Sequence, residues 1–347
     1  MINTAYYKDL TRMNTFRMKV KAKCFIEYDS IADLVDIEFD ELTRPILHIG
    51  GGSNLLFTED FKGTVLHSKI NFIEILDECS GPEVLVSVGS GVVFDDFCDW
   101  AAKEGLWGVE NLSYIPGEVG ASAVQNIGAY GVEVKDVIHR VYCYDTLEEE
   151  FVSFGVDECG YGYRDSIFKD PEIKGRYIVT HVVFELSREP RPCLEYGHLK
   201  SAVEAVAASD TLTPALIRKV IIKIRKEKLP EPSVMGSAGS FFKNPVISLE
   251  HFQRIESAAK AEHGADYKVP HYDLPDGVKV PAAWMIEQCG WKGRRSGGAA
   301  VYEKQPLVIV NYTGEAYPEE IIGLERRIIA SVKDKFGVEL HPEVDHI

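Results

Sequence analysis

The chain has 347 residues, 45% of them apolar, and a formal net charge of −16. This length predicts two or three domains, because single domains usually hold ~100–200 residues. The acidic excess argues against nucleic acid as a partner, since phosphate binding needs clustered Lys and Arg. No apolar run approaches the ~20 residues that a membrane-spanning helix needs, so we expect no membrane association.

The cellular compartment is indicated by the N-terminus and the cysteines. The segment from Met1 to Arg17 lacks the apolar middle and the cleavage site of a secretory signal. The seven cysteines are an odd number and form no C-x-x-C pair, which is typical of a reducing compartment rather than of a disulfide framework or a zinc site. The ten histidines show no H-E-x-x-H spacing. We therefore expect a cytoplasmic protein without a metal site. The cysteines are Cys24, Cys79, Cys98, Cys143, Cys159, Cys193 and Cys289.

Strand-like and helix-like segments alternate without repeats, which indicates an α+β or α/β fold. In chain order, strands are predicted at Pro45–Ile49, Val84–Val88, Val137–Tyr144, Tyr177–Leu186 and Leu307–Val310, and helices at Phe94–Leu106, Ala215–Lys226, Leu249–Ala261, Ala282–Cys289 and Glu319–Lys335. The Pro230-Glu231-Pro232 segment is typical of a hinge. The sequence therefore predicts three regions, 1–69, 70–227 and 228–337, with an apolar tail at 338–347 that packs back.

The first chemical motif is the turn Gly50-Gly51-Gly52-Ser53-Asn54 after the predicted strand at 45–49. Consecutive backbone N–H groups in such a turn form a concave site for a phosphate. It is not the dinucleotide fingerprint G-x-G-x-x-G, because Leu55 fills the third glycine position. The alternative is an ordinary hairpin turn.

The second motif runs from Pro116 to Gly131, with four glycines and three alanines. Small residues at this density indicate that something flat lies close to the backbone. The alternative is a long irregular surface loop, although such loops are usually more polar.

Three further residues are candidates for a part in catalysis. Arg164 lies among tyrosines and has the planar fork that suits a carboxylate, although it could equally be a surface arginine paired with an acid. Ser240 precedes two phenylalanines and could donate a proton to a basic carbon from an apolar niche, or could simply be a turn serine. Glu343 could be a buried acid with a raised pKa or a solvated acid of the tail.

Taken in order along nearly the whole chain, these segments closely resemble the UDP-N-acetylenolpyruvoylglucosamine reductase (MurB) family. The matching stretches are Asn14–Phe16, Gly50–Asn54, Ile115–Gly117, Gln125–Gly131, Tyr163–Lys169, Gly239–Pro245 and Pro342–Val344, and the tyrosine-bearing segment Leu194–Leu199 resembles the type I branch.

The resemblance implies an α+β fold: a two-part FAD-binding unit of the vanillyl-alcohol oxidase type, 1–69 and 70–227, plus a smaller α+β substrate-binding domain, 228–337. It implies that FAD and NADPH serve the reduction of UDP-N-acetylglucosamine enolpyruvate to UDP-N-acetylmuramate in peptidoglycan precursor synthesis, with NADPH and the sugar nucleotide using one site in turn. We expect a monomer.

The resemblance also implies residue roles. Ser240 would be the proton donor, and Arg164 with Glu343 would polarise the enolpyruvyl carboxylate. The implied FAD contacts are Gly50, Gly51, Gly52, Ser53, Asn54, Leu55, Pro116, Gly120, Gln125, Asn126, Gly128, Ala129, Tyr130, Gly131, Ile178 and Arg225. The implied substrate contacts are Tyr163, Tyr196, Lys228, Asn244 and Tyr272.

One position departs from the family pattern, and two rival functions stay open. Asp345 stands where some relatives have Arg, which reverses the charge of that tail position. A flavin oxidase of the same fold would often tether its flavin through His or Cys, and neither occurs between Pro116 and Gly131. A non-enzymatic nucleotide-sugar binder would not need Arg164, Ser240 and Glu343 together.

Overall fold

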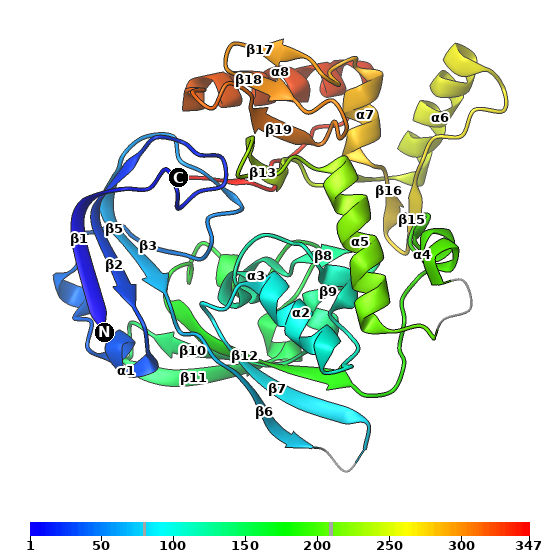
Figure 1. Ribbon diagram of the computed structural model, residues 1–347. Coiled ribbons are helices and arrows are strands. Elements are labelled where there is room, and N and C mark those ends of the chain that lie inside the picture. Colours follow the sequence, from blue (N-terminus) through cyan, green and yellow to red (C-terminus); the bar gives the residue numbers. More distant parts are fainter. Residues whose placement is uncertain (79–80, 208–210) are drawn as a thin grey trace. The chain divides into compact units, whose positions relative to one another are not determined.

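The computed structural model describes residues 1–78, 81–207 and 211–347 (Figure 1). Cys79 lies outside the described residues. The chain divides into two compact units. The first holds Met1–Leu10, Val20–Gly52 and Asp60–Glu227, and the second holds Thr11–Lys19, Ser53–Glu59 and Lys228–Ile347. The three-domain division predicted from the sequence stays a prediction.

The first unit contains two main sheets. One has the order β1-β2-β5-β3, from β1 (Ile2–Asp9), β2 (Lys21–Tyr28), β5 (Phe61–Ser68) and β3 (Ile46–Ile49). The other has the order β11-β10-β12-β7-β6, from β11 (Glu150–Gly155), β10 (Ile138–Asp145), β12 (Tyr177–Ser187), β7 (Glu83–Gly89) and β6 (Ile73–Glu78). A short hairpin pairs β8 (Gly128–Ala129) with β9 (Val132–Glu133).

The helices of the first unit are α1 (Ile31–Val35), α2 (Phe94–Lys103), α3 (Val119–Gln125), α4 (Leu199–Ala207) and α5 (Pro214–Lys228, whose last residue belongs to the second unit), with a 3-10 turn η2 at Glu110–Leu112. Helices α2 and α3 lie on one face of the five-stranded sheet (Figure 1). Their apolar sides, including Phe97 and Val119, form one buried cluster with Val86, Val182 and Phe184. This burial fixes both helices on the sheet, since apolar area removed from water is the main favourable term in packing.

The second unit has three small sheets. The first has the order β13-β19-β18-β17, from β13 (Gly236–Ser240), β19 (Val308–Asn311), β18 (Ala299–Val301) and β17 (Arg295–Ser296). The second has the order β14-β16-β15, from β14 (Val246–Ile247), β16 (Gly277–Lys279) and β15 (Tyr272–Leu274). The third pairs β4 (Leu55–Leu56) with β20 (Asp345–His346). The helices are α6 (Leu249–His263), α7 (Ala282–Gln288) and α8 (Pro318–Phe336), and α7 and α8 lie beside the sheet of β17 to β19 (Figure 1).

The strands and helices predicted from periodicity are confirmed within one to three residues at most ends. Thr213 caps α5 through a hydrogen bond from the Leu216 N–H to its Oγ1 at 3.2 Å. Gly337 ends α8 with φ +67. The sequence analysis did not predict β1, β2 and β5, which form most of the four-stranded sheet, or helix α3. Helix α3 is short, and its few apolar residues between Gly, Ala and Ser are too few to form a clear stripe.

Three findings concern membrane-spanning helices, metal ligands and cysteines. Among the described residues, no helix is long and apolar enough to cross a membrane. No group of three or more His, Cys, Asp or Glu side chains there is arranged to hold a metal ion. The six cysteines that the structure describes are free thiols; four are buried and two, Cys193 and Cys289, are half-buried.

The packing predicts that two phenylalanines of the same sheet contribute very differently to the free energy of unfolding. Phe184 is fully buried and its ring centroid lies 4.7 Å from that of Phe97, whereas Phe151 is 57% exposed. Phe184→Ala should lower the free energy of unfolding by about 3–5 kcal/mol because it leaves a cavity. The control Phe151→Ala should cost about 1 kcal/mol or less. Denaturant unfolding measures both, and equal costs would contradict this packing.

Candidate functional site

Two glycine-rich segments of the first unit lie against each other. A Cβ built on Gly51 would lie 3.3 Å from the Cα of Gly117, and one built on Gly50 would lie 3.0 Å from the Cβ of Ala121. A side chain at Gly50 or Gly51 would make unusually tight contacts with the second segment and would require it to shift by a few tenths of an ångström. The structure therefore brings together the turn after β3 and the small-residue stretch, which the sequence identified separately. Ser53, Asn54 and Leu55 of the same turn belong to the second unit.

Within the small-residue stretch, some small residues serve packing of the chain itself. A Cβ on Gly120 would lie 2.8 Å from the Cβ of Ser90, so this glycine lets α3 approach the end of β7. Asn126 is fully buried with φ +43 and ends α3. Its Nδ2 donates to Gly162 O at 2.8 Å and to Glu133 Oε2 at 3.0 Å. The Asn126 side chain therefore holds the shape of this segment.

Arg164 is anchored to the same stretch. Its Nη1 donates to the carbonyl of Asn126 at 3.2 Å and its Nη2 to the carbonyl of Gly128 at 2.6 Å. Its backbone has φ +56, and the ring of Tyr163 lies 5.4 Å from its guanidinium carbon. Lys169 Nζ donates to Gln125 Oε1 at 2.9 Å. The guanidinium plane is thus fixed beside the Gln125–Gly131 segment that the sequence singled out.

Non-glycine residues with positive φ cluster around this segment. Tyr114, Asn126, Tyr130 and Arg164 have φ between +43 and +61. Such conformations cost ~1–3 kcal/mol each and tend to gather at functional sites. Arg225, from α5, donates through Nε to the carbonyl of Tyr114 at 3.1 Å, and burial lowers the pKa of its guanidinium. The strained positions therefore mark the same region as the predicted contacts.

Tyr196 lies beside the β8–β9 hairpin. Its ring is 6.1 Å from that of Tyr130 in an edge-to-face arrangement, and its Cβ would lie 3.4 Å from a Cβ on Gly131. Asn111, buried in η2, holds the two segments together, since its Nδ2 donates to Tyr130 O at 2.9 Å and to Cys193 O at 2.7 Å. The sequence prediction missed this role of Asn111.

The remaining predicted positions of the first unit have ordinary surroundings. Ile178 is 2% exposed and belongs to the apolar cluster that also holds Tyr28 and Leu66. Ala129 is half-buried in β8, and Pro116 precedes Gly117, which has φ +124.

In the second unit, the C-terminal tail lies between two segments that hold predicted site residues. Asn54 Nδ2 donates to the carbonyl of Glu343 at 3.0 Å, and the Asp345 N–H donates to the carbonyl of Asn54 at 3.0 Å. On the other side, the Glu343 N–H donates to the carbonyl of Phe241 at 2.8 Å. The structure therefore places Asn54, Glu343 and the residue after Ser240 in one hydrogen-bonded group.

Ser240 ends β13 after an irregularity in the strand. The register shifts between Ser237 and Ser240, and Gly239 has φ +70, which is the geometry of a bulge. Bulges often re-aim a side chain next to a functional site. The Ser240 side chain is exposed, so the apolar niche that the sequence suggested is not present around it.

The predicted substrate contacts of the second unit lie on three segments, and Asn244 lies shortly after the Ser240–Phe241 segment. Asn244 Oδ1 accepts a hydrogen bond from the Ala282 N–H at 2.9 Å, at the start of α7. Tyr272, in β15, is 44% exposed, and the Lys279 Nζ lies 5.8 Å from its ring centroid. Lys228 is exposed at the end of α5.

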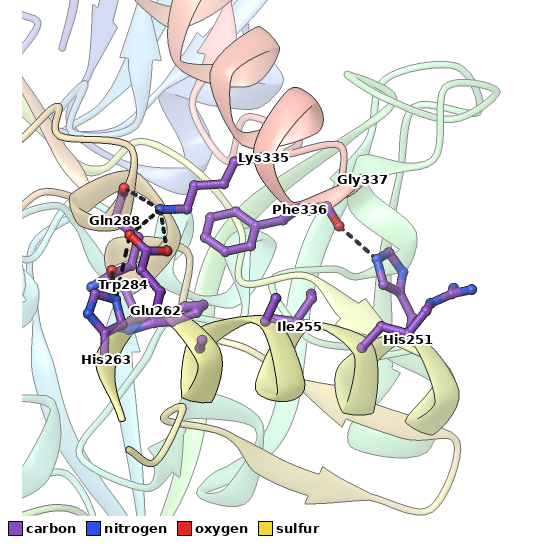
Figure 2. Close-up of a pocket in the computed structure, with 12 residues that line it drawn as sticks. His251, Ile255, Glu262, His263, Trp284, Gln288, Lys335, Phe336 and Gly337 are labelled. Carbon is purple, nitrogen blue, oxygen red and sulfur yellow. Dashed lines mark hydrogen bonds and ion pairs between the residues drawn. The ribbon is translucent and has the colours of Figure 1, made fainter. Parts of the chain in front are cut away.

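A pocket of about 460 Å³ lies elsewhere in the second unit, between α6, α7 and α8 (Figure 2). Trp284 and Phe336 form its apolar part, and Lys335 pairs there with Glu262 at 3.2 Å. Its lining includes none of the residues predicted for the site. Because Lys335 and His251 are hydrogen bonded inside the protein, we assign no ligand to it.

Comparison with known proteins agrees with the geometry. Residues 231–347 match the family model described as UDP-N-acetylenolpyruvoylglucosamine reductase, C-terminal domain, and residues 22–150 match an FAD binding domain. Curated proteins named UDP-N-acetylenolpyruvoylglucosamine reductase are similar over their whole length. The protein from Bacteroides fragilis (strain YCH46) is 50% identical over 96% of this chain and 97% of its own. The protein from Porphyromonas gingivalis (strain W83) is 43% identical over 97% of both chains.

Two solved structures share the fold. The UDP-N-acetylenolpyruvylglucosamine reductase (MurB) from Thermus caldophilus has a TM-score of 0.67 at 22% identity, covering 100% of this chain and 98% of that one. The 6-hydroxy-D-nicotine oxidase from Arthrobacter nicotinovorans has a TM-score of 0.55 at 15% identity, covering 97% and 86%. The predicted α+β fold with an oxidase-like FAD-binding unit is confirmed.

The geometry predicts a structural role for Asn111 that a stability measurement can test. Asn111→Ala removes a donor from two carbonyls, and it should lower the free energy of unfolding by about 1–3 kcal/mol. It should also speed amide hydrogen exchange in the segment around Cys193. The control Asn3→Ala, at an exposed position of β1, should change stability by less than about 0.5 kcal/mol. Unchanged exchange around Cys193 would contradict the role of Asn111.

Proposed function

The chain belongs to the UDP-N-acetylenolpyruvoylglucosamine reductase family and carries its FAD-binding domain, and on that premise we propose that it reduces UDP-N-acetylglucosamine enolpyruvate to UDP-N-acetylmuramate with NADPH. The observation that supports this most is the close approach of Gly51 to the backbone of Gly117, and of Gly50 to Glu118 and Ala121, inside the region matched by the FAD-binding model. We place the reaction in the cytoplasm, in peptidoglycan precursor synthesis, on a monomer.

The turn Gly50–Asn54 and the stretch Pro116–Gly131 have residues that fit FAD. Backbone amides at a turn without Cβ atoms suit a pyrophosphate, and Ser53 and Asn54 add polar side chains next to it. Gln125, Gly128, Ala129 and Gly131 would lie along the flavin with Pro116, Gly120, Asn126, Tyr130, Ile178 and Arg225. Asp345 lies in β20 directly after Val344, and we propose no flavin contact for it. Bound FAD would take hydride from NADPH and return it to the enolpyruvyl double bond.

Arg164 and Glu343 have the charges that this reduction needs. When hydride reaches the terminal carbon of the double bond, negative charge develops on the neighbouring carbon and on the carboxylate. Arg164, whose guanidinium plane is fixed by two backbone carbonyls, would stabilise that charge, and Glu343 would share a hydrogen bond with the carboxylate. Fixed donors work well because they need no rearrangement during the reaction.

Ser240 would supply the proton. An alcohol is a weak acid, but a carbanion-like carbon is a strong base, so the transfer is downhill once charge has developed. The Gly239 bulge sets the direction of the Ser240 side chain. Tyr163, Tyr196, Lys228, Asn244 and Tyr272 would bind the sugar nucleotide, with Lys228 at the diphosphate, and NADPH and this substrate would use the site in turn.

Ser240→Ala separates the two half-reactions. NADPH should still bleach the oxidised flavin at a normal rate, while turnover of the enolpyruvyl sugar nucleotide should fall by roughly 10²–10⁴-fold. Stopped-flow absorbance measures the first rate and product formation the second. The control Ser233→Ala, an exposed serine of the same unit, should leave both unchanged. An equal fall in both half-reactions of Ser240→Ala would exclude Ser240 as the proton donor.

Arg164→Lys tests the need for a planar fork. A lysine keeps the charge but cannot bridge the carbonyls of Asn126 and Gly128 while it faces a carboxylate. We expect kcat/KM for the enolpyruvyl sugar nucleotide to fall by roughly 10²-fold. The control Arg191→Lys, at an exposed ion pair with Glu83, should behave like the unchanged protein. Near-normal steady-state rates for Arg164→Lys would argue against its role.

A further inference from the structure

A group of three charged side chains, Glu27, His67 and Glu118, lies next to the glycine contact of the first unit. His67, in β5, is 5% exposed. Its Nε2 donates to Glu118 Oε1 at 3.0 Å, and its Nδ1 lies 3.4 Å from Glu27 Oε1. Glu27 stands directly opposite His67 in the pairing of β2 with β5. A carboxylate close to each ring nitrogen favours the imidazolium, because an opposite charge within ~4–6 Å stabilises the charged form.

Glu118 connects this group to the glycine contact. It precedes α3, and its carboxylate makes no capping hydrogen bond to that helix. Its Oε2 would lie 3.2 Å from a Cβ on Gly50. On the other side of the pairing, His67 stands opposite Ile49, the last residue before Gly50. His67 therefore connects Glu118, near the start of the second segment, to strand β3, which leads into the first glycine turn.

We propose that the His67 imidazolium, held between Glu27 and Glu118, is a positioning residue for the FAD site and makes the affinity for FAD depend on pH. This inference rests on the proposed placement of the FAD pyrophosphate at the turn after β3. With His67 charged, the three groups carry a net charge of −1. When His67 loses its proton, the net charge of the three groups becomes −2. This charge lies beside the proposed site of the FAD pyrophosphate, which is an anion.

The pKa shifts of His67 and of its neighbours support this proposal. Burial lowers the pKa of His67, but the hydrogen bond and charge of Glu118, followed by the charge of Glu27, outweigh burial and raise it. From β3, His48 faces the group; burial and then the His67 charge lower its pKa to about 4, so it stays neutral. Tyr28 donates to His48 Nε2 at 2.7 Å, and burial raises the pKa of its phenol. His67 is therefore the group of this cluster whose loss of charge is shifted to higher pH.

The sign of the effect follows from linkage. His67 has a raised pKa in the folded protein, so its charge is present at lower pH and is lost as pH rises through that pKa. FAD should bind more weakly once the charge is lost. By reciprocity, FAD binding should raise the pKa of His67 further.

The test measures the FAD dissociation constant of the apoprotein between about pH 6 and pH 8.5 by flavin fluorescence. We expect it to rise by roughly three- to ten-fold over this range in the unchanged protein, since a unit charge nearby acts through a screened but partly buried medium. His67→Gln should bind FAD with no such pH dependence. Glu118→Gln, which removes the anion next to Gly50, should bind FAD at least as tightly as the unchanged protein at the high end of the range.

His181→Gln is the matched control. His181 lies in β12, stacked on Tyr142 with ring centroids 4.3 Å apart, and burial lowers its pKa. This variant should keep the full pH dependence. A proton NMR titration of the histidine ring signals, with His67 assigned from the His67→Gln spectrum, should show a pKa that rises when FAD binds, and this readout does not need a variant that binds FAD.

The outcomes separate the inference from the proposed function. FAD affinity that is independent of pH, or a His67 pKa that FAD leaves unchanged, overturns the role of His67 while the enzyme assignment stands. No binding of FAD by the unchanged protein at any pH overturns the proposed function itself.

Discussion

The close approach of two backbones, at Gly51 and Gly117, is the constraint on which the first unit's site depends. Each glycine lies at the end of a different structural element: Gly51 follows β3 of one sheet, and Gly117 precedes α3, which packs on the other sheet. A side chain at Gly51 would make a tight contact with the Gly117 backbone, and Gly117 itself has φ +124, which favours glycine. Packing and backbone conformation therefore favour both glycines, and their contact joins elements that belong to the two sheets.

Around this contact, polar side chains are used mainly to hold backbone segments in uncommon conformations. Asn126 and Asn111 each donate to two acceptors of neighbouring segments, and Arg164 donates to two carbonyls. These side-chain donors fix the segments from within, which matters because a small positional error can cost much of an enzyme's rate. In the second unit, the tail has the same function for Glu343, which is held by Asn54 on one side and by Phe241 on the other.

Much of the secondary structure was predictable from the sequence, and the reasons for the omissions are physical. Helices α5 and α8 have apolar stripes with capping residues at their ends, so periodicity locates them. Helix α3 has neither, because its small residues are selected by close packing against Ser90 and Gly50. The motif-based resemblance identified the family, and the family and the FAD-binding domain are now established.

Long-range relations were not accessible from the sequence. The Glu27–His67–Glu118 group joins positions far apart in the chain, and a single histidine in a buried strand gives only a weak signal of it. The exposure of Ser240 also differs from expectation, because the bulge at Gly239 changes the direction of the strand's side chains. The roles of Arg164, Ser240 and Glu343 stay predictions.

The most direct test of the central claim is an absorbance spectrum of the purified protein, taken without oxygen before and after two additions. The account predicts the yellow bands of oxidised flavin, their loss on addition of NADPH, and their return when UDP-N-acetylglucosamine enolpyruvate is added. A colourless protein that binds no added FAD, or a flavin that NADPH reduces but the enolpyruvyl sugar nucleotide does not reoxidise, would contradict it.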